Sequence, residues 1–127
     1  MMLYRFAHKT GSYGVSIVEE DGNQVLVQVE QVIKHPKQGD LHNPTSTENV
    51  FFHERKALSQ FEKRYASRSQ LRTFNVEPIT YIASLQQALS DLEQKLNAQN
   101  TLHAQMSLEN LQRLKEDYSL QYKQNFE

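Results

Sequence analysis

The sequence contains no cysteine and no tryptophan, and its 127 residues include only four glycines and three prolines. The absence of cysteine excludes disulfide bonds, thiolate metal ligands and a cysteine nucleophile. It also leaves no thiol for the N-terminal lipidation of bacterial lipoproteins. No stretch approaches the roughly 20 apolar residues that span a bilayer, and residues 1–14 hold no apolar run of signal-peptide length. We therefore expect a cytoplasmic protein without direct membrane insertion.

An excess of charge of either sign is also missing. Lys and Arg number 14, Asp and Glu number 15, and the formal net charge is −1. This balance argues against a nucleic-acid partner, because such binding depends on neutralising phosphates. A small aromatic and basic set near the N-terminus is better interpreted as an ordinary hairpin with core aromatics. That set consists of Tyr4, Arg5, Phe6, Lys9 and Tyr13.

The first half of the chain alternates apolar and polar side chains, which predicts strands over residues 3–8, 13–20 and 24–35. Asp21-Gly22 between the last two strands is a strong hairpin signal, because glycine accepts a positive φ angle at little cost. The alternation slips after Glu30, and a β-bulge there accounts for the slip.

Residues 50–59 predict another strand, although the pattern leaves open whether His53 or Glu54 points inward. Several short strands in succession favour a small twisted barrel of four or five strands over residues 1–66. Residues 60–77 are interpreted as a connector that holds one short helical turn.

The second half has no glycine, and its last proline is Pro78, which suits the first turn of a helix. Leucines and other apolar residues recur there at spacings of three and four, which predicts two helices separated by a break at 97–101. The fold class is therefore α+β: a barrel and then an antiparallel helical hairpin over 67–127, in one compact unit. The stripes comprise Ile82, Leu85, Leu89, Leu92 and Leu96, then Leu111, Leu114 and Tyr118.

Polar residues that carry chemistry gather in two segments, HPKQGDLHNP at 35–44 and FFHER at 51–55. Imidazole and carboxylate are the metal ligands that remain in a chain without cysteine. No helical H-E-x-x-H motif is present, so a metal site would draw on loop and strand residues. The weak candidates for such a site are His35, Asp40, His42 and His53, with Glu54 as an alternative.

A structural interpretation of these segments is better supported. Pro36 and Pro44 bracket the first segment, Gly39 accepts positive φ, and Asp40 is a good partner for loop amides. An ordered loop of this length is typical of a functional surface. His53 and Glu54 could form a general acid-base pair. No nucleophile and no phosphate-binding glycine loop accompanies them in the sequence, which disfavours a catalytic role.

The motifs V-I-K-H-P-K-Q-G-D-L-H-N-P and F-F-H-E-R-K-A-L, with HKTGSYGVSIVEE before them and LENLQRLKEDY after them, span most of the chain. On these residues the sequence resembles the kinase-associated protein B family of Firmicutes. The resemblance implies an SH3-like barrel followed by helices. It also implies a regulatory, non-enzymatic role beside a sensor histidine kinase, in the phosphorelay that starts sporulation. The family carries a lipoprotein label, which this sequence does not support because it has no cysteine.

Three hypotheses follow. The first is a regulatory binding module without a cofactor, whose docking surface comprises His35, Pro36, Gln38, Gly39, Asp40, His42, Phe51, Phe52, His53, Glu54 and Arg55. The second is a metal-dependent hydrolase that uses the histidine and carboxylate cluster. The third is a scaffold in which the helices of two copies pair as a homodimer, because a two-helix hairpin hides its apolar stripe poorly by itself.

Overall fold

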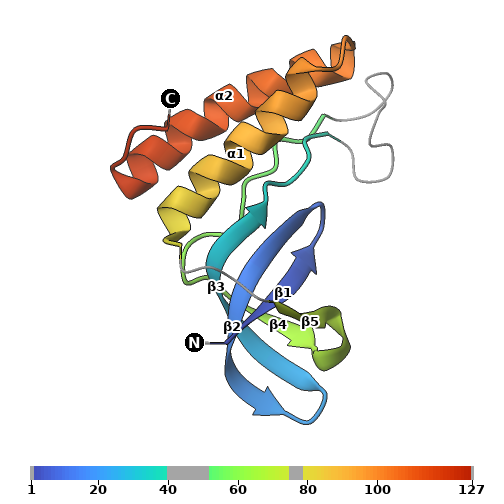
Figure 1. The fold of residues 1–127 in the computed structure, drawn as a ribbon, viewed down its shortest axis with the longest axis vertical. Helices are drawn as coiled ribbons and strands as arrows, with labels where there is room; N and C mark the ends of the chain where they lie inside the picture. Colours follow the sequence, from blue (N-terminus) through green and yellow to red (C-terminus); the bar gives the residue numbers. More distant parts are fainter. Residues whose placement is uncertain (1, 40–51, 75–78, 127) are drawn as a thin grey trace.

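A computed structural model describes residues 2–39, 52–74 and 79–126. It contains a five-stranded sheet followed by two helices (Figure 1). The α+β fold class predicted from the sequence is confirmed. The elements are β1 (Leu3–His8), β2 (Gly11–Asp21), β3 (Gln24–Lys34), β4 (Lys63–Ser67), the 3-10 helix η1 (Arg68–Gln70), β5 (Leu71–Phe74), α1 (Tyr81–Asn97) and α2 (Leu102–Tyr122).

The sheet is antiparallel throughout, with the strand order β4-β3-β2-β1-β5. This is an SH3-like order, in which the long central strands pair on both sides. The sheet is not closed, because β4 and β5 stand at its two ends instead of pairing with each other. The three strands expected in the first half are all present.

The predicted irregularity after Glu30 is also present. Gly14 pairs with Gln31 and Val15 pairs with Val29, so Glu30 is an extra residue on β3. The bulge restores the inward orientation of the apolar residues that follow it. Val29 and Val32 are consequently both buried, although they differ in parity along the strand.

The strand expected at 50–59 is wrong for its described part, since residues 52–59 have no strand structure. The strands lie instead in β4 and β5, inside the segment interpreted as a connector; the short helical turn expected there is η1. β4 is a short end strand in which only Ala66 is buried, and this gives almost no alternating signal. The backbone of 52–58 forms most of its hydrogen bonds with side chains rather than with a neighbouring strand, and one with the backbone amide of Gly39.

Both helices begin at a threonine cap. Thr80 Oγ1 accepts a hydrogen bond from the amide of Ala83, and Thr101 Oγ1 accepts one from Ala104. Such caps satisfy amides that the first turn leaves without partners. The expected helix break therefore lies where it was predicted, whereas Pro78 is outside the described residues.

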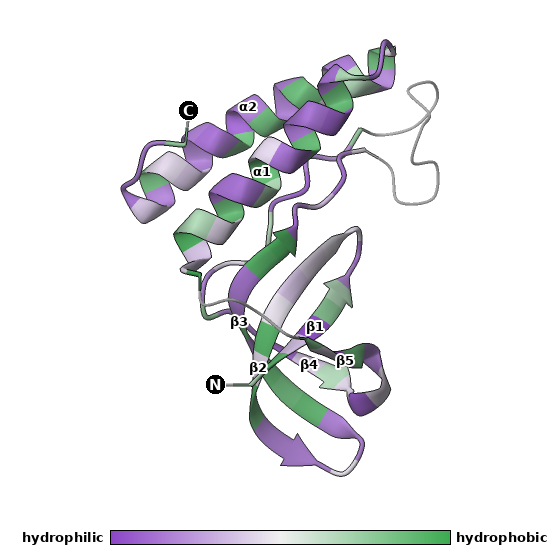
Figure 2. Cartoon of the chain, viewed as in Figure 1, coloured by the Kyte–Doolittle hydropathy of each residue, from purple (hydrophilic) through white to green (hydrophobic). Residues whose placement is uncertain are grey.

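The apolar stripes of the two helices face the core. Leu85, Leu89, Leu96, Leu111 and Leu114 are buried, and they join the sheet valines in one hydrophobic cluster. Hydrophilic residues interrupt the hydrophobic ones along both helices, as Figure 2 shows. The helices lie side by side beyond one end of the sheet in Figure 1. No helix within the described ranges is long and apolar enough to cross a bilayer.

α1 is joined to the sheet by polar bonds as well as by apolar packing. Ser84 Oγ accepts a hydrogen bond from the amide of Val32 at 2.9 Å, next to the bulge in β3. Gln31 Nε2 donates to the carbonyl oxygen of Ile79 at 3.2 Å. These two bonds fix the start of α1 against the end of β3.

Candidate interaction site around residues 35–39 and 52–58

Two segments far apart in the sequence, 35–39 and 52–58, lie side by side between the sheet and α2 (Figure 1). The amide of Gly39 donates to the carbonyl oxygen of His53 at 2.9 Å. In return, Arg55 Nε donates to the carbonyl oxygen of Gly39 at 2.9 Å. The two motifs that stand out in the sequence therefore form one structural unit in their described parts.

Gln38 joins the two segments through its side-chain amide. Its Nε2 donates to the carbonyl oxygens of Pro36 at 2.9 Å and Arg55 at 3.0 Å. Its Oε1 accepts a hydrogen bond from the amide of Arg55 at 2.8 Å. The Gln38 side chain is only 3% exposed, so it replaces the ladder bonds that a neighbouring strand would supply to Arg55.

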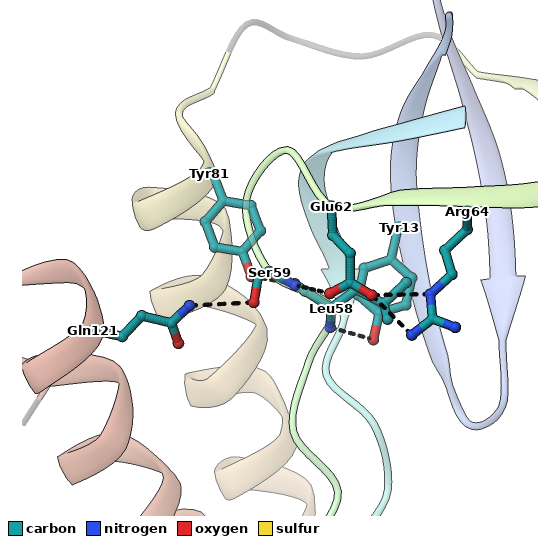
Figure 3. A network of polar contacts seen from close by, with 7 residues as sticks. All are labelled: Tyr13, Leu58, Ser59, Glu62, Arg64, Tyr81 and Gln121. Atoms are coloured by element: carbon teal, nitrogen blue, oxygen red, sulfur yellow. Dashed lines mark hydrogen bonds and ion pairs between the residues drawn. The ribbon is translucent and has the colours of Figure 1, made fainter. Parts of the chain in front are cut away.

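Tyrosine hydroxyls from three elements bind the backbone of Ala57 and Leu58. The amide of Ala57 donates to the hydroxyl oxygen of Tyr118 at 2.8 Å, and the amide of Leu58 donates to that of Tyr13 at 3.2 Å. The Tyr81 hydroxyl donates to the carbonyl oxygen of Leu58. Figure 3 shows Leu58 between Tyr81 and Tyr13. Side chains of β2, α1 and α2 thus fix this irregular segment.

Burial keeps these tyrosines protonated. Desolvation raises the pKa of Tyr13 to about 12, and it also raises the pKa values of Tyr81 and Tyr118. A buried phenol resists ionisation because the phenolate would lose its hydration. Each hydroxyl is therefore a stable hydrogen-bonding group at neutral pH.

His35 is 3% exposed, and both its ring nitrogens have hydrogen-bond partners. Nδ1 lies 3.0 Å from the carbonyl oxygen of Pro36, which only accepts, so Nδ1 carries the proton. Nε2 then accepts from the Tyr118 hydroxyl at 2.8 Å. Burial lowers the pKa of His35 to about 4, consistent with a neutral ring of this tautomer.

The metal hypothesis gains little from this arrangement. His35 uses both nitrogens within the fold, and no group of three or more potential ligands comes together among residues 2–39, 52–74 and 79–126. His53 is exposed on the neighbouring segment. Asp40 and His42 lie outside the described residues, so their part in a metal site stays a prediction.

The opposite side of the 52–58 segment is polar and open to solvent. His53, Glu54 and Lys56 are exposed, so neither His53 nor Glu54 points into the core. Glu54 forms an ion pair with Arg113 Nε on α2 at 2.9 Å. Asn110 Nδ2 donates to the carbonyl oxygen of His53 at 3.3 Å, and Arg113 also bonds to Asn110 Oδ1. The Glu54–Arg113 ion pair and the buried Asn110 side chain thus join the segment to α2.

Gly39 packs tightly beneath Phe52. Its φ angle is +103°, and a Cβ atom there would lie 3.1 Å from the Phe52 ring and 3.2 Å from His103 Nε2. The Phe52 and His103 rings themselves meet edge to face, with centroids 5.1 Å apart. Phe52 is therefore half-buried, while Phe51 lies outside the described residues.

The predicted site residues thus divide into two groups. His35, Pro36, Gln38 and Gly39 are buried supports, whereas Phe52, His53, Glu54 and Arg55 have at least partial exposure. The sequence did not indicate the tyrosine supports or Arg113. One signal was available for Tyr118: a tyrosine within an apolar helix stripe needs a buried partner for its hydroxyl.

Comparison with known proteins agrees with this fold and these motifs. The model of the family described as kinase associated protein B matches residues 8–119. Kinase-associated lipoprotein B of Bacillus subtilis (strain 168) is 37% identical over 111 residues, which cover 87% of each chain. The crystal structure of kinase-associated protein B from Bacillus cereus has a TM-score of 0.75 and 26% identity. That match covers 93% of this chain and 95% of the other.

The chain thus has the α+β fold of an open five-stranded antiparallel sheet followed by two helices, which it shares with the Bacillus cereus protein. The chain belongs to the kinase-associated protein B family. That family is named for association with a kinase rather than for an enzyme activity.

Proposed function

We propose that the chain is a regulatory binding protein that acts with a sensor histidine kinase to activate the sporulation phosphorelay, in the cytoplasm and without catalysing a reaction. The support for a kinase partner is the membership of the family and the name of the Bacillus subtilis relative. The absence of cysteine and of a bilayer-spanning helix among the described residues supports a cytoplasmic location.

The docking surface in this proposal is the exposed side of residues 52–56 together with Arg113. One observation carries the choice: buried side chains hold the backbone behind this segment, while its polar side chains remain exposed. A surface that is already ordered loses little conformational entropy on binding. Phe52 supplies an aromatic anchor and the Glu54–Arg113 pair supplies charge, a mixture typical of interaction hot spots.

Asp40, His42 and Phe51 belong to the same proposed surface, because they continue the two segments in sequence. His35, Pro36, Gln38 and Gly39 support it from below. The proposed binding partner at this surface is the cytoplasmic portion of a sensor histidine kinase.

The test is direct binding. The cytoplasmic portions of the sensor kinases encoded in the same genome would be titrated calorimetrically with the wild-type chain and with Glu54→Gln. We expect Glu54→Gln to weaken the complex about tenfold, the loss typical of a charged interface group. Glu109→Gln is the matched control, since Glu109 is an exposed α2 carboxylate without an ion pair in the described part of the chain.

Equal affinity of the Glu54 variant and the wild-type chain for the kinase would contradict the proposed surface. Failure of every kinase to bind the wild-type chain would contradict the partner. Autophosphorylation of the bound kinase, followed with and without the chain, separates a regulator from a passive ligand.

A further inference from the structure

A partly open cleft of about 130 Å³ lies on the other side of the same segment, between it and the sheet. Basic side chains dominate its wall, and none of its lining residues is an aspartate or a glutamate. Its lining includes Lys9, Tyr13, Arg55, Lys56, Leu58 and Arg64.

This concentration of positive charge is local. The whole chain carries a formal net charge of −1, so the cleft does not simply share the character of a basic protein. Lys9 follows β1, Arg55 and Lys56 lie on the 52–58 segment, and Arg64 lies on β4. Three separate parts of the fold thus contribute four basic residues to the lining of the cleft. The ammonium of one of them, Lys56, lies 5.6 Å from the centroid of the Tyr118 ring.

Most of this charge is not neutralised within the described residues. Lys9, Arg55 and Lys56 take part in none of the ion pairs formed there. Arg55 uses Nε to hold the carbonyl oxygen of Gly39, and its two terminal nitrogens form no hydrogen bond with the described residues. Arg64 is paired with Glu62, the nearest carboxylate, at 2.8 Å.

A hydroxyl donor completes the wall. The Tyr13 oxygen accepts a hydrogen bond from the amide of Leu58, as Figure 3 shows beside the Glu62–Arg64 pair. The Tyr13 proton has no acceptor among the described residues, although the side chain is only 1% exposed. A buried hydroxyl normally donates its proton, so this group has a free donor at the cleft.

The titration of His8, another lining residue, reflects the same surroundings. Burial lowers the pKa of His8, and the charges of Arg64 and Lys9 lower it further, with Glu62 acting in the opposite direction. The field at the cleft is therefore positive despite the one neighbouring carboxylate.

We propose that this cleft binds a phosphoryl group. The positive charge of the four basic residues exceeds the negative charge of the neighbouring Glu62. A phosphoryl group would balance this excess, because it carries about −1.5 to −2 charges at pH 7 and has three strong acceptor oxygens. Guanidinium groups suit its geometry, because they donate two parallel hydrogen bonds to phosphate oxygens. The cleft lies on the sheet side of the segment, and it shares Arg55 and Lys56 with the face that the proposed kinase complex uses.

Nuclear magnetic resonance titration tests the proposal with inorganic phosphate as the probe. We expect saturable shifts of the Lys9, Tyr13, Lys56 and Arg64 amides at millimolar phosphate, weakened by added chloride because salt screens exposed charges. Acetate, which carries a single charge, should shift the same amides more weakly. Shifts that do not saturate, or that lie elsewhere on the chain, would overturn the proposal.

Two pairs of variants identify the residues responsible. Lys9 and Lys123 are both lysines with left-handed backbone, at φ 53° and 54°. Asparagine tolerates this conformation, so Lys9→Asn and Lys123→Asn are matched. Lys56→Gln is matched with Lys95→Gln on α1. We expect the cleft variants to weaken phosphate binding about tenfold and the other two to leave it unchanged. Equal effects within each pair would show general charge attraction and overturn the site.

The source of the phosphoryl group is resolved by comparing three probes at one ionic strength. A phosphoserine peptide that saturates the same amides below the phosphate concentration assigns the site to a modified protein. Phosphate that binds as well as the peptide assigns it to a free anion. An aspartate-rich peptide that binds as tightly as the phosphopeptide would overturn the choice of a phosphoryl group.

Discussion

The hydroxyl oxygen of Tyr118 lies 2.8 Å from Nε2 of His35 and 2.8 Å from the amide nitrogen of Ala57. It donates to the imidazole of His35 and accepts from the amide of Ala57. One side chain of α2 therefore supplies a hydrogen-bond partner to the segment that follows β3 and to the 52–58 segment. The helix, the end of β3 and the 52–58 segment are thereby coupled through a single oxygen atom.

Tyr118→Phe removes this oxygen while keeping the ring and its packing. The amide of Ala57 and Nε2 of His35 are then buried without partners, and each such group costs about 1–3 kcal/mol. We expect the free energy of unfolding to fall by about 2–6 kcal/mol in urea denaturation. Tyr65→Phe is the control, because Tyr65 is 68% exposed; its effect should stay within about 0.5 kcal/mol. Equal effects would show that water replaces the bonds of Tyr118.

The sequence predicts a structural feature well only where the residues that form its hydrogen bonds or contacts are close to each other in the sequence. The bulge at Glu30 was predictable, because the slip in alternation lies within one strand. The support of residues 52–58 was not, because Gln38, Tyr13, Tyr81 and Tyr118 reach them from 17 to 61 positions away. The segment has apolar residues only at its two ends, with four polar residues from His53 to Lys56 between them, so its sequence pattern did not distinguish a strand from an irregular segment.

The end strands show a second limit. β4 buries only Ala66, and β5 buries none of its residues fully, so neither has the two-residue period that reveals a strand. Lysine and arginine in such strands discourage edge-to-edge pairing between molecules. The helix break was predictable for the opposite reason: cap residues and leucine spacing act within one turn.

Stability should fall with acid through His35. Its pKa is about 4 in the folded chain and about 6.5 when unfolded, so the unfolded state binds more protons between these values. The contribution of the neutral ring is complete above pH 6.5 and is lost as pH falls towards 4. A difference of about 2.5 pH units corresponds to roughly 3 kcal/mol.

The comparison with His35→Gln isolates this effect, because His8 has a pKa lowered in the same direction. We expect the stability difference between the wild-type chain and the variant to shrink as urea denaturation is repeated from pH 7 down to pH 4.5. A difference that stays constant across this range would mean that the His35 ring is hydrated in the folded protein.

Position 39 should not accept a residue with a side chain, because Gly39 packs against the ring of Phe52. Gly39→Ala places a methyl group against both neighbouring rings in a backbone conformation that costs an L-residue about 1–3 kcal/mol. We expect the melting temperature to fall by roughly 4 °C for each kcal/mol. Gly22→Asn is the matched control: Gly22 has φ +62°, and no atom lies within 4 Å of the position that a Cβ would occupy there, so its melting temperature should stay close to that of the wild-type chain. A Gly39→Ala protein as stable as Gly22→Asn would contradict the tight packing.

The helices should not pair between copies of the chain. Their stripe residues Leu85, Leu89, Leu111 and Leu114 are at most 2% exposed within one chain, so a second copy has little apolar surface to gain there. We expect sedimentation velocity to give one monomeric species over a hundredfold range of concentration. Leu120 is the most exposed apolar residue of α2, at 81%, and Leu102 at the start of the same helix is 60% exposed. If the mass rises with concentration in the wild-type chain and also in Leu120→Gln, the helices associate through another face, and the hydrophobic argument for a monomer is wrong.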